Sequence, residues 1–250
     1  MCNFCGCNKT EVTIENTHKH ADHQDAPGSE HKQQQQIEIE QALLSKNNDY
    51  AEQNRQALQD KGILALNLIS SPGSGKTTLL IEIIKRLKEQ HNIYVIEGDQ
   101  QTTLDASRIK ETGVSAVQVN TGKGCHLDAH MVGHACEHLE MQKYSFLFIE
   151  NVGNLICPAG FDLGEAHKIV ILSVTEGDDK PLKYPQIFHA ADLMVINKID
   201  LLPYVNFNLQ QCCEYARQIN PNIAIIQLSA TSGENINLFS HWLIAAKEQH

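Results

Sequence analysis

The sequence predicts an α/β protein with an open, doubly wound and mostly parallel sheet. From residue 63 onward, short apolar runs alternate with longer segments of helical pattern. The runs 146–149 and 193–196 are apolar at every position, as expected of strands buried on both faces of a parallel sheet. Strands that alternate with helices indicate parallel pairing through helical crossovers. Ligands of such a sheet bind at the carboxyl ends of its strands.

The expected elements follow a regular order along the chain. A helix at 37–60 comes first, because isolated apolar residues recur there among polar ones, and Gly62 ends it. Continuous apolar runs supply the expected strands, which are 63–69, 93–97, 114–119, 145–149, 168–174, 193–197 and 223–228. The remaining segments supply the expected helices, which are 77–90, 104–112, 127–141, 181–190, 207–219 and 235–248.

Residues 1–36 differ from the rest of the chain in composition. Beyond the first seven residues they are polar, with almost no large apolar side chains and with four scattered histidines. A segment of this kind cannot bury enough apolar surface to fold alone. We therefore expect 1–36 to be a disordered metal-binding tail and linker, and 37–250 to be one globular domain with an N-terminal helix.

Composition argues against several classes of function. The formal net charge of −10 makes a nucleic-acid partner unexpected. No apolar run reaches the roughly 20 residues that a membrane-spanning helix needs, and the amino terminus lacks the pattern of a secretory signal. Eight cysteines without an export signal favour a reducing compartment, where thiols bind metals. We therefore expect a cytoplasmic protein with no membrane partner.

A glycine-rich loop lies between the first expected strand and the next helix. It reads Ser-Ser-Pro-Gly-Ser-Gly-Lys-Thr-Thr over 70–78, with Ser70 where the general pattern has its first glycine. Strand, loop with Gly-Lys-Thr and helix form the P-loop arrangement, whose backbone N–H groups hold phosphate oxygens. The expected phosphate-binding residues are Gly73, Ser74, Gly75, Lys76, Thr77 and Thr78.

A second element predicts that the bound base is guanine. Asn197, Lys198 and Asp200 follow the sixth expected strand in the pattern Asn-Lys-x-Asp. The Asp200 carboxylate can accept hydrogen bonds from N1–H and N2–H₂ of guanine, a pair of donors that adenine lacks. We expect Asn197 to tie neighbouring loops together and Lys198 to lie along the base. Ser229 and Ala230 are expected near the guanine oxygen, so the predicted nucleotide is GTP.

Three residues are expected to catalyse hydrolysis, namely Lys76, Asp99 and Glu150. Lys76 would neutralise the β and γ phosphates. Asp99 and Glu150 each end an expected strand, and together with the Thr77 hydroxyl they are the expected ligands of Mg²⁺. Asp99 can also orient the attacking water. The sequence identifies no glutamine for this water, so we expect slow turnover, which suits a switch.

Two clusters of thiols predict metal sites, and the first lies at the amino terminus. Cys2, Cys5 and Cys7 form Cys-x-x-Cys-Gly-Cys. Three thiolates and the terminal amine would make a planar set that suits Ni²⁺, while tetrahedral Zn²⁺ and a partial iron–sulfur site remain alternatives. No disulfide framework fits this spacing.

The second cluster lies within the α/β domain. Cys125 and His126 follow the third expected strand, and Cys157 lies seven residues beyond Glu150. Both segments leave the carboxyl edge of the sheet, so the three side chains can meet around a metal ion, with water or a symmetry mate as a further ligand. A pair of buried cysteines is the alternative.

The other histidines and cysteines of the domain are expected to be structural. His130, His134 and His138 continue from His126 at intervals of four residues, so one face of a helix is rich in histidine. We expect this to be a solvated face, with His130 the one residue that can reach the metal. The remaining cysteines of the domain are expected to pack within helices.

Taken together, these motifs resemble those of the hydrogenase nickel-incorporation GTPases, the HypB family of SIMIBI-class P-loop GTPases. The resemblance covers the amino-terminal cysteine motif and the runs 70–78, 97–102, 121–129, 150–158, 161–165 and 197–200. It implies a P-loop NTPase fold and a cytosolic GTPase that delivers nickel to the large subunit of [NiFe] hydrogenase.

The resemblance also implies metals and partners. It implies nickel at the three amino-terminal cysteines, and nickel or zinc at the cluster of Cys125, His126 and Cys157. It further implies a homodimer promoted by GTP and a HypA-type nickel chaperone as partner. The histidines of the tail are few and scattered, so a role in nickel storage is not implied.

Other readings of the sequence remain open. A urease-type nickel metallochaperone GTPase typically carries Cys-Pro-His, whereas this chain has Cys157, Pro158 and Ala159. A nickel or zinc storage protein with a regulatory nucleotide site is a second alternative, and the intact Lys76, Thr77 and Asp200 argue against a degenerate site of this kind. A MinD-like ATPase is the third, and Asp200 predicts a preference for GTP instead.

Overall fold

The structure, a computed structural model, describes residues 29–99, 104–122 and 124–250. The chain divides into two units, Met1–Lys46 and Asn47–His250, and the contacts given below belong to the second. The first helix, α1 (Ser29–Gln59), begins before its predicted start at residue 37. The predicted amino-terminal thiol site, Cys2, Cys5 and Cys7, lies outside the described residues.

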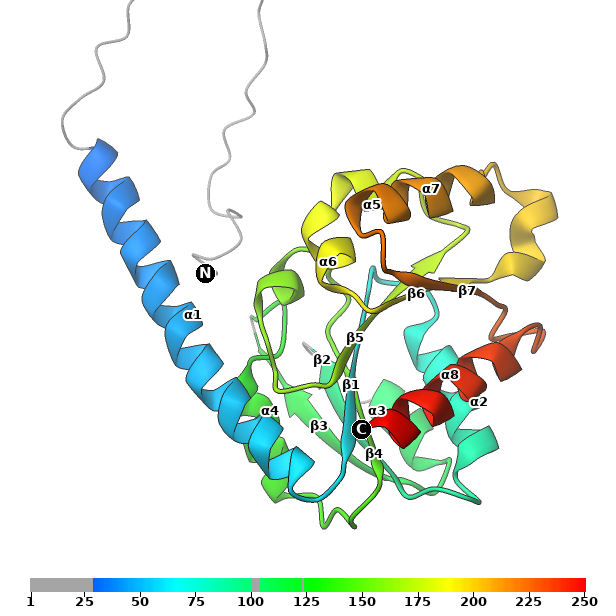
Figure 1. Cartoon of the computed structure of the whole chain (residues 1–250), viewed down its shortest axis with the longest axis horizontal. Coiled ribbons are helices and arrows are strands. Elements are labelled where there is room, and N and C mark those ends of the chain that lie inside the picture. The colour runs from blue at the N-terminus through cyan, green and yellow to red at the C-terminus, as the bar shows by residue number, and fades with distance from the viewer. Residues whose placement is uncertain (1–28, 100–103, 123) are drawn as a thin grey trace, which may run out of the picture. The chain divides into compact units, whose positions relative to one another are not determined.

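Seven parallel strands form one sheet in the order β3-β2-β4-β1-β5-β6-β7 (Figure 1). The strands are β1 (Leu64–Ser70), β2 (Ile93–Asp99), β3 (Ser115–Asn120), β4 (Phe146–Glu150), β5 (His167–Ser173), β6 (Leu193–Asn197) and β7 (Ala224–Gln227). All neighbouring pairs are parallel. The predicted fold class is therefore confirmed, and every predicted strand matches an observed one to within two residues at each end.

The helices that follow α1 lie where they were predicted with one exception, although α4 ends four residues and α2 three residues before the predicted ends. They are α2 (Lys76–Leu87), α3 (Leu104–Lys110), α4 (Ala129–Glu137), α5 (Lys180–Lys183), α6 (Pro185–Ala190), α7 (Leu209–Ile219) and α8 (Ile236–Gln249), with short 3₁₀ helices η1 (Cys157–Gly160) and η2 (Ile199–Tyr204). The predicted helix 181–190 is wrong as a single element, because it breaks at Tyr184, which has a non-helical φ of −126° and ψ of 53°. Pro185 follows, and a residue before proline is disfavoured in the helical region.

Apolar side chains cover both faces of the sheet. On one face, α2, α3 and α8 pack against the central strands. On the other face, helix α4 and the carboxyl end of α1 pack beside β1, β2 and β4. Further along the same face, α6 and α7 pack beside β5 and β6. Leu147 and Phe148 are neighbours in β4 yet belong to opposite faces. Burial on both faces explains why the strands are apolar at successive positions.

Three strands bring polar residues to one edge of the sheet. Ser70 ends β1, Asp99 ends β2 and Glu150 ends β4. Glu150 is in register with Leu68 of β1 and with Glu97 of β2. Because the strands are parallel, segments far apart in the sequence deliver the loop after β1 and several carboxylates to the same place.

None of the helices in the described ranges has both the length and the apolar character needed to cross a lipid bilayer.

Candidate functional site

The P-loop connects β1 to α2 through a tight turn that requires glycine. Gly73 and Gly75 have φ angles of 77° and 91°, in the left-handed region that glycine adopts most easily. A Cβ atom added at Gly75 would lie 2.6 Å from Nδ2 of Asn197. Since α2 begins directly afterwards at Lys76, the unpaired N–H groups of its first turn lie at the loop, where they can bind an anion.

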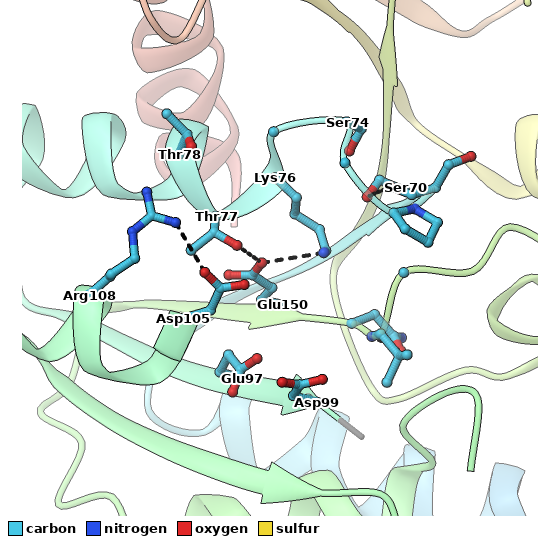
Figure 2. A pocket seen from close by; sticks show the side chains of 18 of the residues that line it. Ser70, Ser74, Lys76, Thr77, Thr78, Glu97, Asp99, Asp105, Arg108 and Glu150 are labelled. Atoms are coloured by element: carbon cyan, nitrogen blue, oxygen red, sulfur yellow. Dashed lines mark hydrogen bonds and ion pairs between the residues drawn. The ribbon is translucent and has the colours of Figure 1, made fainter. Parts of the chain in front are cut away.

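A polar cavity of about 540 Å³ lies at this loop (Figure 2). Its walls include the whole P-loop, the ends of β2 and β4, and Lys198. A cavity of roughly 300–1,000 Å³ is typical of small-molecule sites. The structure therefore brings together the predicted phosphate-binding residues and the predicted catalytic residues around one cavity.

Glu150 is the centre of the polar contacts in this cavity. Its Oε1 accepts a hydrogen bond of 2.6 Å from the Thr77 hydroxyl and lies 3.3 Å from the ammonium of Lys76. Figure 2 shows the side chains of Thr77 and Lys76 converging on this carboxylate. The side chain of Glu150 is 2% exposed, and its Oε2, like Oγ of Ser74, has no hydrogen-bond partner among the described residues. Such buried, unpaired polar atoms are suited to a polar ligand or cation.

Further carboxylates crowd the same wall of the cavity. Glu97 is buried, and this burial, followed by the negative charges of Glu150, Asp99 and Asp105, raises its pKa to about 8. Oε2 of Glu97 is also without a partner in the described part of the chain. Nearby cationic charge is supplied by Lys76, which acts in the opposite direction. This surplus of carboxylate oxygen is the environment that a hard cation such as Mg²⁺ prefers.

The predicted base-binding loops meet at Asn197. Its Nδ2 donates to the carbonyl of Ser74 at 2.9 Å, and its Oδ1 accepts from the backbone N–H of Lys198 at 2.8 Å and of Ala230 at 3.0 Å. The prediction that Asn197 ties neighbouring loops together is thus confirmed by these contacts. Because Asn197 is buried, the P-loop and the loop after β7 are held in a fixed relation.

The other predicted base-binding residues lie next to this junction. Lys198 has a φ of 63° and donates from its ammonium to the carbonyl of Gly73 at 2.6 Å. Oδ1 of Asp200 is buried and makes no hydrogen bond to the described chain. Oγ of Ser229 accepts from the N–H of Ser232 at 3.1 Å. The Asp200 carboxylate therefore has an acceptor available for a donor from outside the chain.

The structure also brings together Cys125, His126 and Cys157. One potential ligand atom from each lies within 4.8 Å of the others. The two Sγ atoms are 2.9 Å apart, and Nδ1 of His126 is 3.6 Å from Sγ of Cys125. Burial lowers the pKa of His126, against a smaller opposite effect of Asp128, so its imidazole is neutral at pH 7 and can donate a lone pair. Two thiols and a neutral imidazole suit Zn²⁺ or Ni²⁺, with one coordination position left open.

Asparagine side chains hold the two segments that carry this cluster. Nδ2 of Asn154 donates to the carbonyl of Cys125 at 3.2 Å, and Oδ1 of Asn151 accepts from the N–H of Leu127 at 3.1 Å. Asn151 directly follows Glu150 in the chain. The cavity wall and the cluster of Cys125, His126 and Cys157 are therefore joined through one short segment.

Two asparagines of α1 bridge the continuations of these two segments, at the start of α4 and just after η1. Asn47 accepts from the N–H of Ala129 at 2.9 Å and donates to the carbonyl of Asp162 at 2.8 Å. Asn54 donates to the carbonyl of Ala129 at 2.7 Å and to that of Leu163 at 3.0 Å. Each amide thus links the start of α4, just after His126, to the segment just after η1.

Sequence reasoning missed several of these contributors. It assigned no role to Glu97, although a charged residue within an apolar strand is a signal for one. It also missed the bridges from α1, because nothing in a helical pattern shows which distant carbonyl an asparagine reaches. The suggestion that His130 can reach the metal is wrong in this structure: the group comprises Cys125, His126 and Cys157, and the His130 ring lies 4.9 Å from that of Tyr50.

The expectation that the remaining cysteines of the domain pack within helices agrees with the structure. Cys212 and Cys213 are buried in the core that α7 forms with β5 and β6, and Cys136 is half-buried beside the core of α4. Burial raises the pKa of Cys136 to about 11 and that of Cys212 to about 12. Both thiols are therefore protonated at neutral pH and poorly suited to bind metal.

Comparison with known proteins agrees with this arrangement. Residues 64–227 match the family model described as CobW/HypB/UreG, nucleotide-binding domain. The hydrogenase maturation factor HypB of Rhizobium leguminosarum bv. viciae is 59% identical over 211 residues, which cover 84% of this chain and 71% of that protein. The hydrogenase/urease maturation factor HypB of Helicobacter pylori strain J99 is 41% identical over 218 residues, covering 86% of this chain and 89% of that protein.

A solved structure has the same architecture. The crystal structure of HypB from Helicobacter pylori in complex with nickel aligns with a TM-score of 0.78 and 41% sequence identity. The alignment covers 82% of this chain and 96% of that one. At this similarity the two chains share one P-loop α/β fold.

Proposed function

The chain belongs to the HypB family of hydrogenase maturation factors, and from this membership we propose that it is a GTP-hydrolysing nickel metallochaperone. Its proposed task is to deliver nickel to the large subunit of [NiFe] hydrogenase in the cytoplasm. The observation that carries the proposal is the cluster of Cys125, His126 and Cys157, whose ligand atoms lie within 4.8 Å of one another and which is joined by one short segment to the P-loop cavity.

The proposed nucleotide is GTP with Mg²⁺. The residues proposed to hold it are Gly73, Ser74, Gly75, Lys76, Thr77, Thr78, Asn197, Lys198, Asp200, Ser229 and Ala230. The unpaired Oδ1 of Asp200 supports guanine, because a base without two donors would leave this buried oxygen unsatisfied. Thr77, Asp99 and Glu150 are the proposed Mg²⁺ ligands, and Lys76 would turn from Glu150 to the phosphates once the cation neutralises that carboxylate.

Nickel is the proposed cargo, and zinc is a proposed occupant of the cluster. The name of the Helicobacter pylori structure states that that relative binds nickel. Two thiols and a neutral imidazole, with one open position, support reversible binding of either ion here. Cys2, Cys5 and Cys7 are proposed as a second nickel site on the spacing of their thiols alone.

We further propose that the nucleotide controls the metal site. Thr77 contacts Glu150, Asn151 is the next residue, and Asn151 accepts from the N–H of Leu127, which follows His126. Mg²⁺ bound at Glu150 would therefore act on the segment that begins at Asn151. This segment contacts the residue next to His126 and leads to Cys157. The coupling free energy expected between such sites is about 1–3 kcal/mol.

The proposed partners follow from the family. They are a second copy of this chain, paired in the GTP-bound state, a HypA-type nickel chaperone, and the hydrogenase large subunit. A dimer would supply further ligands at the open position of the cluster. Each partner is open to direct test by pull-down or by light scattering with and without GTP.

One titration tests the central proposal. The full chain with Cys2, Cys5 and Cys7 changed to Ser is titrated with Ni²⁺ in the presence of Mg²⁺ and either GDP or a non-hydrolysable GTP analogue. The thiolate-to-nickel absorption band reports occupancy of the remaining cluster. We expect affinities that differ by about fivefold or more between the two nucleotides, and Lys76→Ala should abolish the difference. Equal affinities would refute the coupling, and absence of GTP turnover in the unaltered chain would refute the assignment as a GTPase.

A role in urease maturation is the second candidate. It is favoured by the relative from Helicobacter pylori, which is named a hydrogenase/urease maturation factor. Transfer of nickel from the loaded chain to a hydrogenase large-subunit precursor and to apo-urease, measured side by side with radioactive nickel, distinguishes the two candidates.

A further inference from the structure

Helix α4 carries histidines that the proposed function does not use. His130, His134 and His138 are exposed and follow one another at intervals of four residues, so they share one face of the helix and its C-cap. None of them belongs to the cluster of Cys125, His126 and Cys157.

His134 and His138 are arranged differently from His130. Their ring centroids are 5.1 Å apart and the rings are inclined by 43°. With metal–nitrogen bonds of about 2.1 Å, two imidazoles on one ion have centroids roughly 5 Å apart, so the observed spacing fits a shared ion. His130 instead lies against Tyr50, with centroids 4.9 Å apart.

The surroundings leave this pair available. Neither ring has a hydrogen bond or an ion pair to any residue in the described part of the chain, and both are exposed. Helices of zinc peptidases hold their metal through two histidines at the same i, i+4 spacing. There, a third protein ligand completes the site, whereas no three-residue group in the described ranges includes His134 or His138.

We propose that His134 and His138 form an additional metal site for a borderline divalent ion such as Zn²⁺ or Ni²⁺. The two imidazole nitrogens bind the ion, and water fills its other positions. With two protein ligands and full access to solvent, the site binds more weakly and exchanges faster than the thiol cluster. It does not depend on the proposed function, since it needs neither nucleotide nor a client protein.

The test follows each imidazole separately in the full chain. Zn²⁺ is added until the thiol sites are filled, and further Zn²⁺ is then titrated while the side-chain ¹⁵N shifts of the histidines are recorded. We expect ring nitrogens of His134 and His138 to shift together, with one common midpoint. His134→Asn should weaken the response of His138 by about tenfold or more, since even loss of a supporting group around a metal has that effect.

His130→Asn is the matched control, because it removes an exposed histidine one turn earlier on the same helix. It should leave the midpoint of His138 unchanged. The proposal is overturned if His138 responds equally well in His134→Asn, or if His130→Asn weakens it as much, because the histidines would then bind independently as a solvated stripe. Absence of any shift at His134 and His138 would overturn it too, without bearing on GTP turnover.

Discussion

The P-loop cavity and the cluster of Cys125, His126 and Cys157 are joined by one segment but are built in different ways. The cavity is formed by residues at strand ends. Its central carboxylate, Glu150, is paired in register with residues of both adjacent strands, β1 and β2. The cluster stands on two connecting segments, and asparagine side chains such as Asn47 and Asn151 hold these segments together. One site is fixed by the sheet, whereas the other depends on a few side-chain hydrogen bonds.

This difference has a consequence for how each site can respond. Moving a strand end within a seven-stranded sheet would break several backbone hydrogen bonds at once. Moving the segment 151–157 changes mainly side-chain contacts, so it costs less free energy. The cluster is therefore the adjustable site and the cavity the rigid one, as expected if nucleotide state controls metal binding.

The largest expected effect comes from a substitution that impairs the rigid site alone and so tests whether the two sites are separable. Lys76→Ala removes the charge that would stabilise the transferred phosphate, so GTP turnover should fall by at least about a hundredfold. Ni²⁺ binding without nucleotide should stay unchanged. Lys85→Ala, which removes an exposed lysine from the same helix, is the control for turnover and should behave like the parent chain. Loss of Ni²⁺ binding in Lys76→Ala would show that the two sites are not separable.

Base recognition offers the next largest effect. Asp200→Asn replaces an acceptor by a donor, so GTP affinity should fall by about 5- to 150-fold, as expected for about 1–3 kcal/mol of mispaired hydrogen bonds. Xanthine carries an oxygen where guanine carries its amino group, so xanthosine triphosphate should bind the variant better than GTP. Isothermal titration with both nucleotides measures this. If the variant kept its preference for GTP, the base would lie elsewhere.

The adjustable site can be weakened by a substitution that leaves Cys125, His126 and Cys157 unchanged. Asn47→Ala leaves the N–H of Ala129 and the carbonyl of Asp162 without their present partner, so the affinity of the cluster for Co²⁺ should fall by about tenfold. The thiolate-to-cobalt absorption band measures it, with GTP affinity as the second readout. Asn48→Ala is the matched control, because Asn48 is exposed. An equal loss in both variants, or a parallel loss of GTP affinity, would contradict a specific bridge.

The fold was predictable because its signals are local. A strand such as β6 shows its burial on both faces as an unbroken apolar run, and the P-loop shows its turn as glycines at fixed positions. The break at Tyr184 was missed because the apolar pattern continues across it, although Pro185 was a signal. The start of α1 was missed because residues 29–36 carry no apolar period.

The sequence identified the side chains that lie together in each candidate site, but it did not identify the residues that hold them in place. Cys125, His126 and Cys157 can be recognised by residue type and by their place after strands. Asn47 and Asn54 cannot, because an asparagine in a helix is usually solvated and its partners lie far away in sequence. Glu97 was missed for a related reason: its pKa is raised by burial and then by the charge of Glu150, and only strand pairing brings the two carboxylates close.

The smallest predicted effect concerns how much the crowded carboxylates of the rigid site lower the stability of the folded chain. Glu97 has a pKa raised from 4.5 to about 8, so between these values the folded chain keeps a proton that the unfolded chain releases. Stability should therefore fall as pH rises through this window, and level off above it. Glu97→Gln carries no such proton, so its Tm should exceed that of the parent by a few degrees near pH 8 and by less near pH 5.

Thermal unfolding without nucleotide or Mg²⁺ measures this difference, and Glu89→Gln, at an exposed position, is the control. Added Mg²⁺ should shrink the gap, because a cation among the carboxylates favours the ionised form of Glu97 in the parent chain and gains less from the neutral amide. The same pH slope in Glu97→Gln and in the parent would mean that Glu97 ionises freely. The carboxylates would then not repel one another strongly enough for a bound cation to stabilise the fold by neutralising them.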